Sequence, residues 1–256
     1  MLTLVEIHLL FPEDVKVHPA MGSVLHGVLM ECITPDVAAC FHEMALRPYS
    51  QCVYWDVERH EAIWRIGTIS SYAYEHLVQP VQTLKKMYLK HKGYIVQLRS
   101  VEIVQQTTYK KLADFYMQGQ AEPSGADWNM MTVTSFKQGG RYVITPDMRL
   151  VYQSLLNKWN TFSTHSILDE TGIIEQMANH CRLAKYQLSS RTFPLEGQYV
   201  CGFSGTMRQV YFGFDMLKRL QGLLTAYATF AGIGVKTALG MGAVDTKVLF
   251  TGRKQE

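Results

Sequence analysis

The most restrictive feature of this sequence is a glycine-rich stretch near its C-terminal end, AGIGVKTALGMG, residues 231–242. Four of its residues are glycine, at positions 232, 234, 240 and 242. Glycine clusters where the backbone takes a positive φ, or where another backbone or a ligand comes close, because its entropy cost is unfavourable elsewhere. Lys236 and Thr237 add a cation and a hydroxyl, so the stretch is typical of an anion site, with phosphate as the first choice.

Two common phosphate-binding motifs do not fit this stretch. A Walker A loop has glycine directly before Lys-Thr, where this chain has Val235. A dinucleotide-binding fingerprint needs glycine at the position of Thr237 and a strand before the loop. The preceding segment, 214–230, instead repeats apolar residues at helical spacing, and 243–250 has a strand pattern. The stretch therefore connects a helix to a closing strand.

The charge is small but unevenly distributed. The net charge is +3, yet residues 129–256 carry 14 Lys and Arg against 8 Asp and Glu, whereas residues 1–128 carry 11 against 14. The C-terminal half is therefore the basic half, and it is also the half with the predicted anion site. The coincidence favours a polyanionic partner for this half.

Several other classes of protein are disfavoured by composition. No apolar segment approaches the roughly 18 uninterrupted residues that a membrane helix needs, and MLTLVEIHLL at the start lacks a basic leader. We therefore expect a cytoplasmic protein without a membrane partner. Its five cysteines do not form a disulfide framework, and Cys32, Cys40 and Cys52 lack the CxxC spacing of a structural zinc site. We expect neither a metal nor a cofactor.

Hydrophobic periodicity predicts the order strand, helix, strand, strand, helix, strand twice along the chain. In the first round we predict strands over 2–11, 49–57, 62–69 and 94–105, and helices over 21–33, from Thr34 to about His42, and over 72–91. In the second round we predict strands over 130–136, 183–192, 199–213 and 243–250, and helices over 146–162, 167–178 and 214–230. Ala121–Asp127, with its Pro-Ser-Gly, is the predicted linker.

This pattern predicts an α+β protein of two tandem ferredoxin-like (RRM-like) βαββαβ domains packed side by side. The predicted domains are residues 1–120 and 128–256, the second with the glycine-rich stretch.

The residues resemble the CRISPR repeat-processing endoribonucleases of the RAMP superfamily, which end in a helix followed by GxGxKTxxGxG. Gly232, Gly234, Lys236, Thr237, Gly240 and Gly242 all fit that form. Further similar segments are TSFKQGGRYVITPDMRLVYQSLLNKWN (134–160), CGFSG (201–205), LHG (25–27) and FHEMALRPYS (41–50). One difference is Met241, where an aromatic residue is common in the family, which argues against stacking on RNA at that position.

The resemblance implies cleavage of repeat RNA without a metal, by attack of the ribose 2′-hydroxyl on the adjacent phosphate. Such a reaction needs a base, an acid and positive charge, and histidine suits either proton role because its ordinary pKa is about 6.5. His42 best matches the family's catalytic histidine, and the end of a short helix there would favour its protonated form. His26 is the second candidate, and Arg47 the candidate phosphate stabiliser. The choice of acid and base between His42 and His26 stays open.

For RNA binding, the resemblance implies that Lys236 and the glycine-rich stretch hold backbone phosphates, which positions RNA without reading its sequence. Lys137 and Arg141 flank the turn Gly139-Gly140, and Arg191 lies on a basic strand of the same half. The implied partner is CRISPR repeat RNA, with subunits of an effector complex or a second copy of the chain left open. The alternative function is that of a non-catalytic RNA-binding subunit of a CRISPR effector complex.

Overall fold

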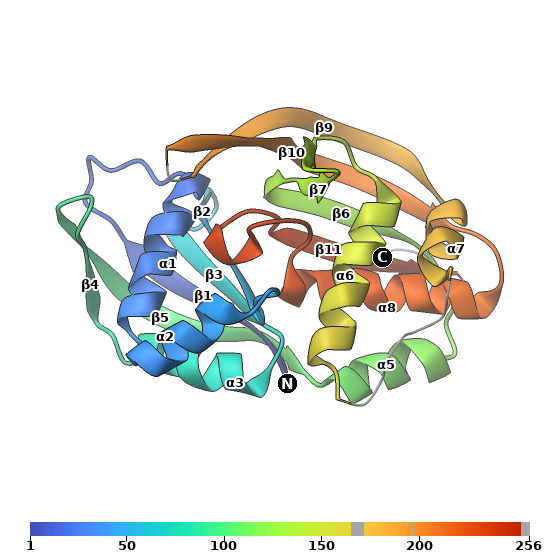
Figure 1. Cartoon of the computed structure of the whole chain (residues 1–256), viewed down its shortest axis with the longest axis horizontal. Helices are drawn as coiled ribbons and strands as arrows, with labels where there is room; N and C mark the ends of the chain where they lie inside the picture. The colour runs from blue at the N-terminus through green and yellow to red at the C-terminus, as the bar shows by residue number, and fades with distance from the viewer. Residues whose placement is uncertain (165–171, 196, 252–256) are drawn as a thin grey trace.

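Two antiparallel sheets lie side by side in the computed structural model, with helices packed in front of them (Figure 1). The structure describes residues 1–164, 172–195 and 197–251. The first sheet has the strand order β2-β3-β1-β5-β4 and the second the order β11-β6-β10-β9. Apart from the added edge strand β4, each order is the ferredoxin-like one, so the predicted fold class is confirmed.

The first half contains the strands β1 (Leu2–Leu10), β2 (Tyr49–Asp56), β3 (Glu61–Thr68), β4 (Lys86–Leu89) and β5 (Tyr94–Thr107). Its longer helices are α1 (Gly22–Glu31) and α2 (Pro35–Glu43), and the short turn η1 (Pro19–Met21) precedes α1. The segments α3 (Ser71–Ala73), η2 (Tyr74–Val78) and α4 (Gln79–Gln82) follow one another directly. Helix α5 (Tyr109–Gln118) leads to the second half.

The second half contains the strands β6 (Pro123–Thr134), β9 (Cys181–Leu195), β10 (Gln198–Tyr211) and β11 (Val244–Phe250), and the small hairpin β7 (Phe136–Gln138) and β8 (Arg141–Val143). Its helices are α6 (Met148–Phe162), α7 (Ile173–Asn179) and α8 (Asp215–Ala231), with a 3₁₀ turn η3 (Thr237–Leu239) inside the glycine-rich stretch. The stretch thus joins helix α8 to the last strand, as predicted. Part of the predicted helix 167–178 lies outside the described residues.

Two predictions about local structure are wrong. The predicted helix 72–91 ends at Gln82, and β4 pairs with β5 through a turn at Gly93, which has a φ of +77°. In β4, Met87 and Leu89 are buried whereas Lys86 and Tyr88 are exposed, which is a strand alternation. The lysines that suggested a helix end are therefore in and around a hairpin.

The predicted linker Ala121–Asp127 is mostly strand, because β6 begins at Pro123. Proline is tolerated at the first position of a strand. Gly125 sits so close to β10 that a Cβ there would lie 2.3 Å from the carbonyl oxygen of Gln209. Proline and glycine in this segment therefore serve a strand start and a close sheet contact, and the division into domains at 120 and 128 stays a prediction.

Helices cover one face of each sheet, and each half has its own hydrophobic core. Strand β1 contributes residues to both cores. Val5, Ile7 and Leu9 of β1 pack with α1 and α2, whereas Leu2 and Leu4 pack with the core of the second half. None of the described helices has the length and apolarity needed to cross a membrane.

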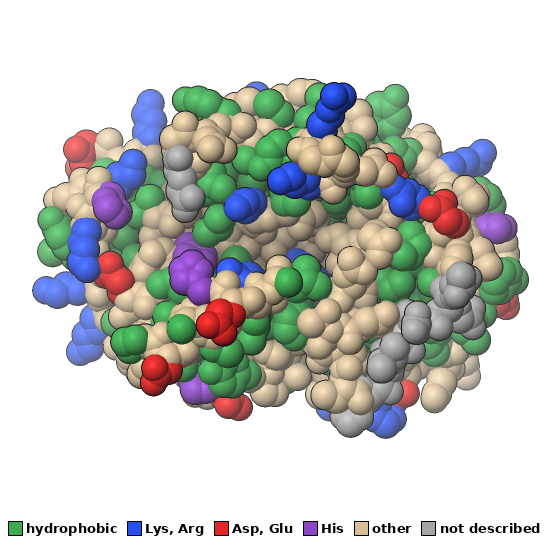
Figure 2. Space-filling view, viewed as in Figure 1, with side chains coloured by type: hydrophobic (Ala, Val, Ile, Leu, Met, Phe, Trp, Pro, Cys, Tyr) green, Lys and Arg blue, Asp and Glu red, His purple; other side chains and the backbone are tan. Residues whose placement is uncertain are grey.

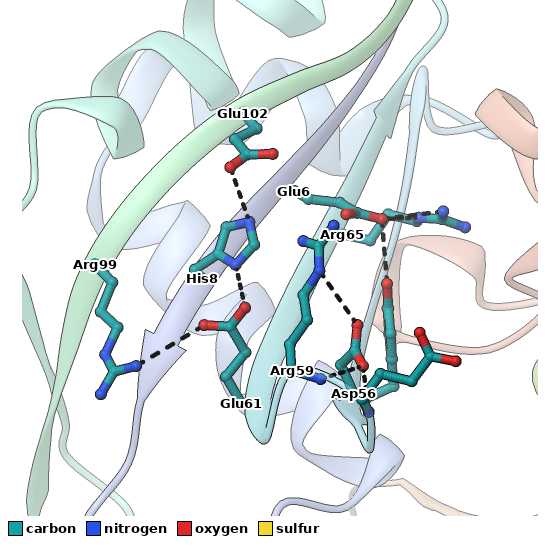
Figure 3. Close-up of polar contacts among 10 residues, drawn as sticks. Glu6, His8, Asp56, Arg59, Glu61, Arg65, Arg99 and Glu102 are labelled. Atoms are coloured by element: carbon teal, nitrogen blue, oxygen red, sulfur yellow. Dashed lines mark hydrogen bonds and ion pairs between the residues drawn. The ribbon is translucent and has the colours of Figure 1, made fainter.

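A polar network lies on the face of the first sheet that α1 and α2 leave free (Figure 3). His8 Nδ1 is 2.7 Å from Glu61 Oε1. Arg65 contacts Glu6 at 3.0 Å and reaches across to Asp245 of β11 at 2.5 Å. Arg65 thereby connects β3 of the first sheet with the last strand of the second.

Candidate functional site

The candidate catalytic side chains come from α1, α2 and the connection between α2 and β2. His26, half-buried on α1, has its Nε2 atom 3.1 Å from the Tyr49 hydroxyl oxygen, at the first position of β2. His42 is exposed in the last turn of α2. Arg47 donates from Nη2 to the carbonyl oxygen of His42 at 3.0 Å, and from Nη1 to the carbonyl oxygen of Met44. The three predicted catalytic residues are thus neighbours.

This grouping has a clear electrostatic effect on His26. The pKa of His26 is lowered to about 4, mainly by burial and then by the nearby positive charges of Arg47 and His42. Burial also raises the pKa of Tyr49 to about 12. At neutral pH His26 is therefore an uncharged imidazole beside a protonated phenol, so it has a nitrogen lone pair with which to accept a proton or a hydrogen bond.

His42 is placed differently. Helix α2 begins after Thr34 with Pro35 in its first turn, and it ends at Glu43, one residue past the predicted end. The last carbonyl groups of a helix carry a partial negative charge, which favours a cation in the final turn. The local geometry thus keeps His26 neutral at neutral pH and leaves His42 open to solvent at a helix end, an arrangement in which His26 can act as a base and His42 as an acid.

The glycine-rich stretch is tightly folded between the two halves. Gly242 has a φ of +65°, and a Cβ on it would lie 1.9 Å from the carbonyl oxygen of Ile233. A Cβ on Gly234 would lie 2.2 Å from the carbonyl oxygen of Ser135. The amides of Ile233 and Val235, among others, donate to protein carbonyls. The glycines thus serve close backbone contacts within the protein, and Lys236, in a left-handed conformation, is the exposed cation of the stretch.

Two side chains of helix α6 form hydrogen bonds with the glycine-rich stretch. Ser154 Oγ accepts from the amide of Gly234 at 2.9 Å. One turn later, Lys158 donates from Nζ to the carbonyl oxygen of Ala231 at 2.5 Å and to Thr237 Oγ1 at 3.0 Å. Lys158 is only 3% exposed, and burial lowers its pKa to about 7. The predicted RNA-binding residue Thr237 is itself buried on this lysine.

The glycine-rich stretch contacts the first turn of α1, the helix that carries His26. A Cβ on Gly240 would lie 3.0 Å from Gly22 Cα and 3.3 Å from the Phe193 ring. Gly22 is one helical turn before His26, so the two residues lie on the same side of α1. In Figure 2, histidine side chains lie beside Lys and Arg side chains near the middle of the same face, at a hollow between the halves.

The other predicted RNA-binding residues are exposed on the second half. Lys137 and Arg141 are on β7 and β8, and the carbonyl oxygen of Ser135, just before β7, accepts from the amide of Val235 in the glycine-rich stretch. Arg191 is on β9, two residues before Phe193, and therefore on the same side of the strand as the ring that packs near Gly240. The predicted cations thus lie near the stretch on the β7–β8 hairpin and on β9.

Sequence reasoning missed Tyr49 and Lys158 as parts of the site. Tyr49 follows Arg47-Pro48 and was expected only to start a strand. Lys158 interrupts the apolar side of α6, three residues after Leu155 and next to Trp159. A lysine at a core position of a helix was the available signal for a buried polar contact.

Comparison with known proteins gives a consistent result. The family model "CRISPR-associated endoribonuclease Cas6" matches residues 129–244. A Cas6 endoribonuclease of Mycobacterium tuberculosis (strain CDC 1551 / Oshkosh) is 30% identical over 90% of this chain and 72% of its own length. One of Streptococcus thermophilus is 26% identical over 89% of this chain and 92% of its own length. Among solved structures, a Cas6 product complex has a TM-score of 0.80 at 21% identity, covering 96% of this chain and 100% of that one.

Proposed function

Since this chain belongs to the family of CRISPR-associated endoribonucleases Cas6, we propose that it cuts CRISPR repeat precursor RNA into guide RNAs without a metal. The reaction is attack of a ribose 2′-hydroxyl on the adjacent phosphate, which leaves a 2′,3′-cyclic phosphate and a 5′-hydroxyl. The observation that supports this most is the neighbourhood of His26, His42 and Arg47, with unlike environments for the two histidines.

In this proposal His26 is the base. Its lowered pKa keeps the imidazole uncharged at neutral pH, and Tyr49 fixes the orientation of the ring through the 3.1 Å contact with Nε2. In this scheme Nε2–H donates to the Tyr49 hydroxyl oxygen, so the lone pair on Nδ1 takes the proton of the 2′-hydroxyl as the 2′-oxygen attacks phosphorus. A base with so low a pKa is weak, but it stays in the reactive form over a wide pH range.

His42 is the acid in the same scheme. It lies exposed at the C-terminal end of α2, and it gives its proton to the leaving 5′-oxygen. Arg47, which already binds the end of α2, supplies positive charge near the phosphate as negative charge accumulates on it.

The RNA strand lies across the second half in this proposal. Lys236 and the glycine-rich stretch hold phosphates next to α1, and Lys137, Arg141 and Arg191 extend the positive surface away from it. These contacts position the strand, and the attraction weakens as salt rises.

The test is cleavage of a repeat transcript in EDTA with the wild-type protein and His42→Ala. We expect the variant to cut roughly 10²–10⁴-fold more slowly, because it lacks a proton donor, and to bind the transcript as tightly as the wild type. His91→Ala, which removes an exposed histidine from the turn between β4 and β5, is the matched control and should cut normally.

Mapping both product ends identifies the chemistry. A 5′-hydroxyl and a cyclic phosphate support attack by the 2′-hydroxyl, and a 5′-phosphate contradicts it. Cutting that survives both His42→Ala and His26→Ala would exclude the proposed mechanism. Repeat RNA that is bound tightly but recovered whole would indicate the non-catalytic alternative.

A further inference from the structure

A buried glutamine connects the glycine-rich stretch to the helix that carries His26. Gln51, on β2, is 2% exposed. Its Nε2 group donates to the carbonyl oxygen of Gly22 at 2.6 Å and to that of Ala238 at 2.9 Å. Its Oε1 atom accepts from Trp64 Nε1 at 2.8 Å. One side chain thus bonds to the start of α1, to η3 of the glycine-rich stretch, and to β3.

The orientation of this amide follows from its partners. The indole N–H of Trp64 can only donate, and the two backbone carbonyls can only accept, so the oxygen must face Trp64 and the NH₂ group must face Gly22 and Ala238. Both NH₂ hydrogens are then used. Because Gln51 is buried and both of its NH₂ hydrogens are bonded, it holds its two backbone partners at a fixed separation.

Beside Gln51, the backbone of α1 lies very close to the backbone of the glycine-rich stretch. A Cβ on Gly22 would lie 2.8 Å from Gly240 Cα and 3.0 Å from the carbonyl oxygen of Leu239, so the two backbones touch beside Gln51. Tyr49, two residues earlier on β2, points to the same side of the strand and binds His26. Alternate residues of one strand therefore fix the ring of His26, the start of its helix and the glycine-rich stretch.

We infer that Gln51 is a positioning residue that sets the register between the RNA strand on the glycine-rich stretch and His26, and so determines which phosphodiester is cut. This inference rests on the proposed function, in which the second half holds the strand and the first half supplies the proton carriers. A small displacement between the two halves of such a site moves a different phosphate toward the histidine. Gln51 touches neither the RNA nor the reacting atoms.

The test compares Gln51→Met, which keeps the length of the side chain without its hydrogen bonds, with the wild-type protein. We expect the rate at saturating RNA to fall by roughly 10²-fold, as for a displacement of about 1 Å, with a Kd for RNA close to that of the wild type. We also expect part of the product to end at a neighbouring phosphodiester. A loss of stability alone would not move the cleavage position.

Gln209→Met is the matched control, because Gln209 is also buried and its Oε1 also accepts from a tryptophan, Trp128, at 3.0 Å. Its Nε2 group donates to Tyr152 within the second half and makes no contact with α1. This variant should lose stability and keep the wild-type product end. If Gln51→Met does not fold, Gly22→Ala tests the same register, because its new Cβ pushes α1 and the glycine-rich stretch apart while Gln51 remains.

A measurement without RNA separates this inference from the proposed function. Hydrogen exchange should become faster in Gln51→Met at residues 22–26 and 237–240 together, and in Gln209→Met at neither segment. A folded Gln51→Met with a single wild-type product end, or with unchanged exchange in both segments, overturns the inference. A wild-type protein that does not cut repeat RNA contradicts the proposed function, and the exchange result still decides the role of Gln51.

Discussion

At the scale of single residues, the two histidines differ because their surroundings differ. His26 is half-buried on a packed helix, with Arg47 and His42 close enough for their positive charges to oppose its protonation. His42 lies in solvent at the end of α2. Desolvation therefore keeps one histidine neutral, whereas the other is open to solvent at a helix end.

This difference predicts the pH dependence of the Arg47→Met variant. Below its pKa, His26 is protonated and cannot act as a base, so the wild-type rate should fall only as pH approaches about 4. Removing the Arg47 charge removes part of the opposition to protonation, so the pKa of His26 rises and the fall begins at higher pH. Single-turnover rates from pH 4 to 8, with NMR titration of His26, measure this shift.

Arg47→Lys is the control for that experiment. It keeps the positive charge, and its profile should follow the wild type more closely than that of Arg47→Met does. If the cleavage rate fell at the same pH in all three proteins, Arg47 would have no effect on the pKa of His26.

At the scale of elements, the glycine-rich stretch depends on α6. Ser154 and Lys158 are one turn apart on one side of that helix and bind the stretch at Gly234, Ala231 and Thr237. A lysine amine in the core is tolerated because three oxygen atoms lie within hydrogen-bond distance of its Nζ atom. At its other end, the carbonyl oxygen of Gly242 accepts from the amide of Ile233 at 2.9 Å, and the amide of Gly242 donates to the carbonyl oxygen of Val133 at 3.0 Å.

The buried lysine predicts a pH-dependent stability. In the unfolded chain Lys158 has its ordinary pKa of 10.5, and in the folded chain the pKa is about 7. Between these values the unfolded state binds more protons, so the free energy of unfolding rises with pH in this window, by about 1.4 kcal/mol for each pKa unit of difference. Below pH 7 the cost of burying the charge is fully present.

Lys158→Met removes this contribution. We expect the wild type to gain stability relative to the variant as pH rises from 7 to 10, measured by urea unfolding at each pH. Lys110→Met, at an exposed site on α5, should follow the wild type over the same range. A constant difference between wild type and Lys158→Met would contradict a lowered pKa for the buried amine.

At the scale of the whole molecule, the two sheets are joined on both faces. On the helix side, Gln51 connects α1 to the glycine-rich stretch. On the free face, Arg65 bonds to Glu6 in its own sheet (Figure 3). It also bonds to Asp245 in the other sheet. Glu6 also accepts from the Tyr54 hydroxyl at 3.1 Å. The relative position of the halves therefore depends on a few long-range polar contacts as well as on the shared core.

Arg65→Met tests the contact on the free face. Its loss leaves Glu6 without its cation and Asp245 without its partner across the sheets, so we expect about 2 kcal/mol less stability. Arg208→Met is the control, because Arg208 pairs with Asp127 on exposed neighbouring strands of one sheet, where solvent screens the pair and its loss should cost less stability than the loss of Arg65. Urea unfolding of both variants measures the difference, and equal losses would show that the contact between sheets has no special weight.

Much of the architecture could be predicted because it is recorded in local patterns. Apolar residues at helical spacing predicted α6 and α8, and Thr34-Pro35 predicted the start of α2. The glycine-rich stretch fits neither nucleotide-binding motif, and its flanking patterns correctly predicted a helix before it and a closing strand after it. The errors arose where tertiary contacts override such patterns. Lys86–Leu89 is a strand, and not part of a helix, because it pairs with β5. Gly125 belongs to a strand that lies close to Gln209, although its presence in the sequence suggested a linker.

The order of the elements, the basic half and the kinds of side chain at the site can all be predicted from local patterns, because periodicity and composition are properties of nearby residues. The contacts of Tyr49 with His26, of Lys158 with the glycine-rich stretch, and of Gln51 with both sides of the site follow only from the packing of distant segments. Gln51 and Ala238 are 187 positions apart in the chain. Their contact depends on how two sheets pack against each other, and no local pattern encodes that distance.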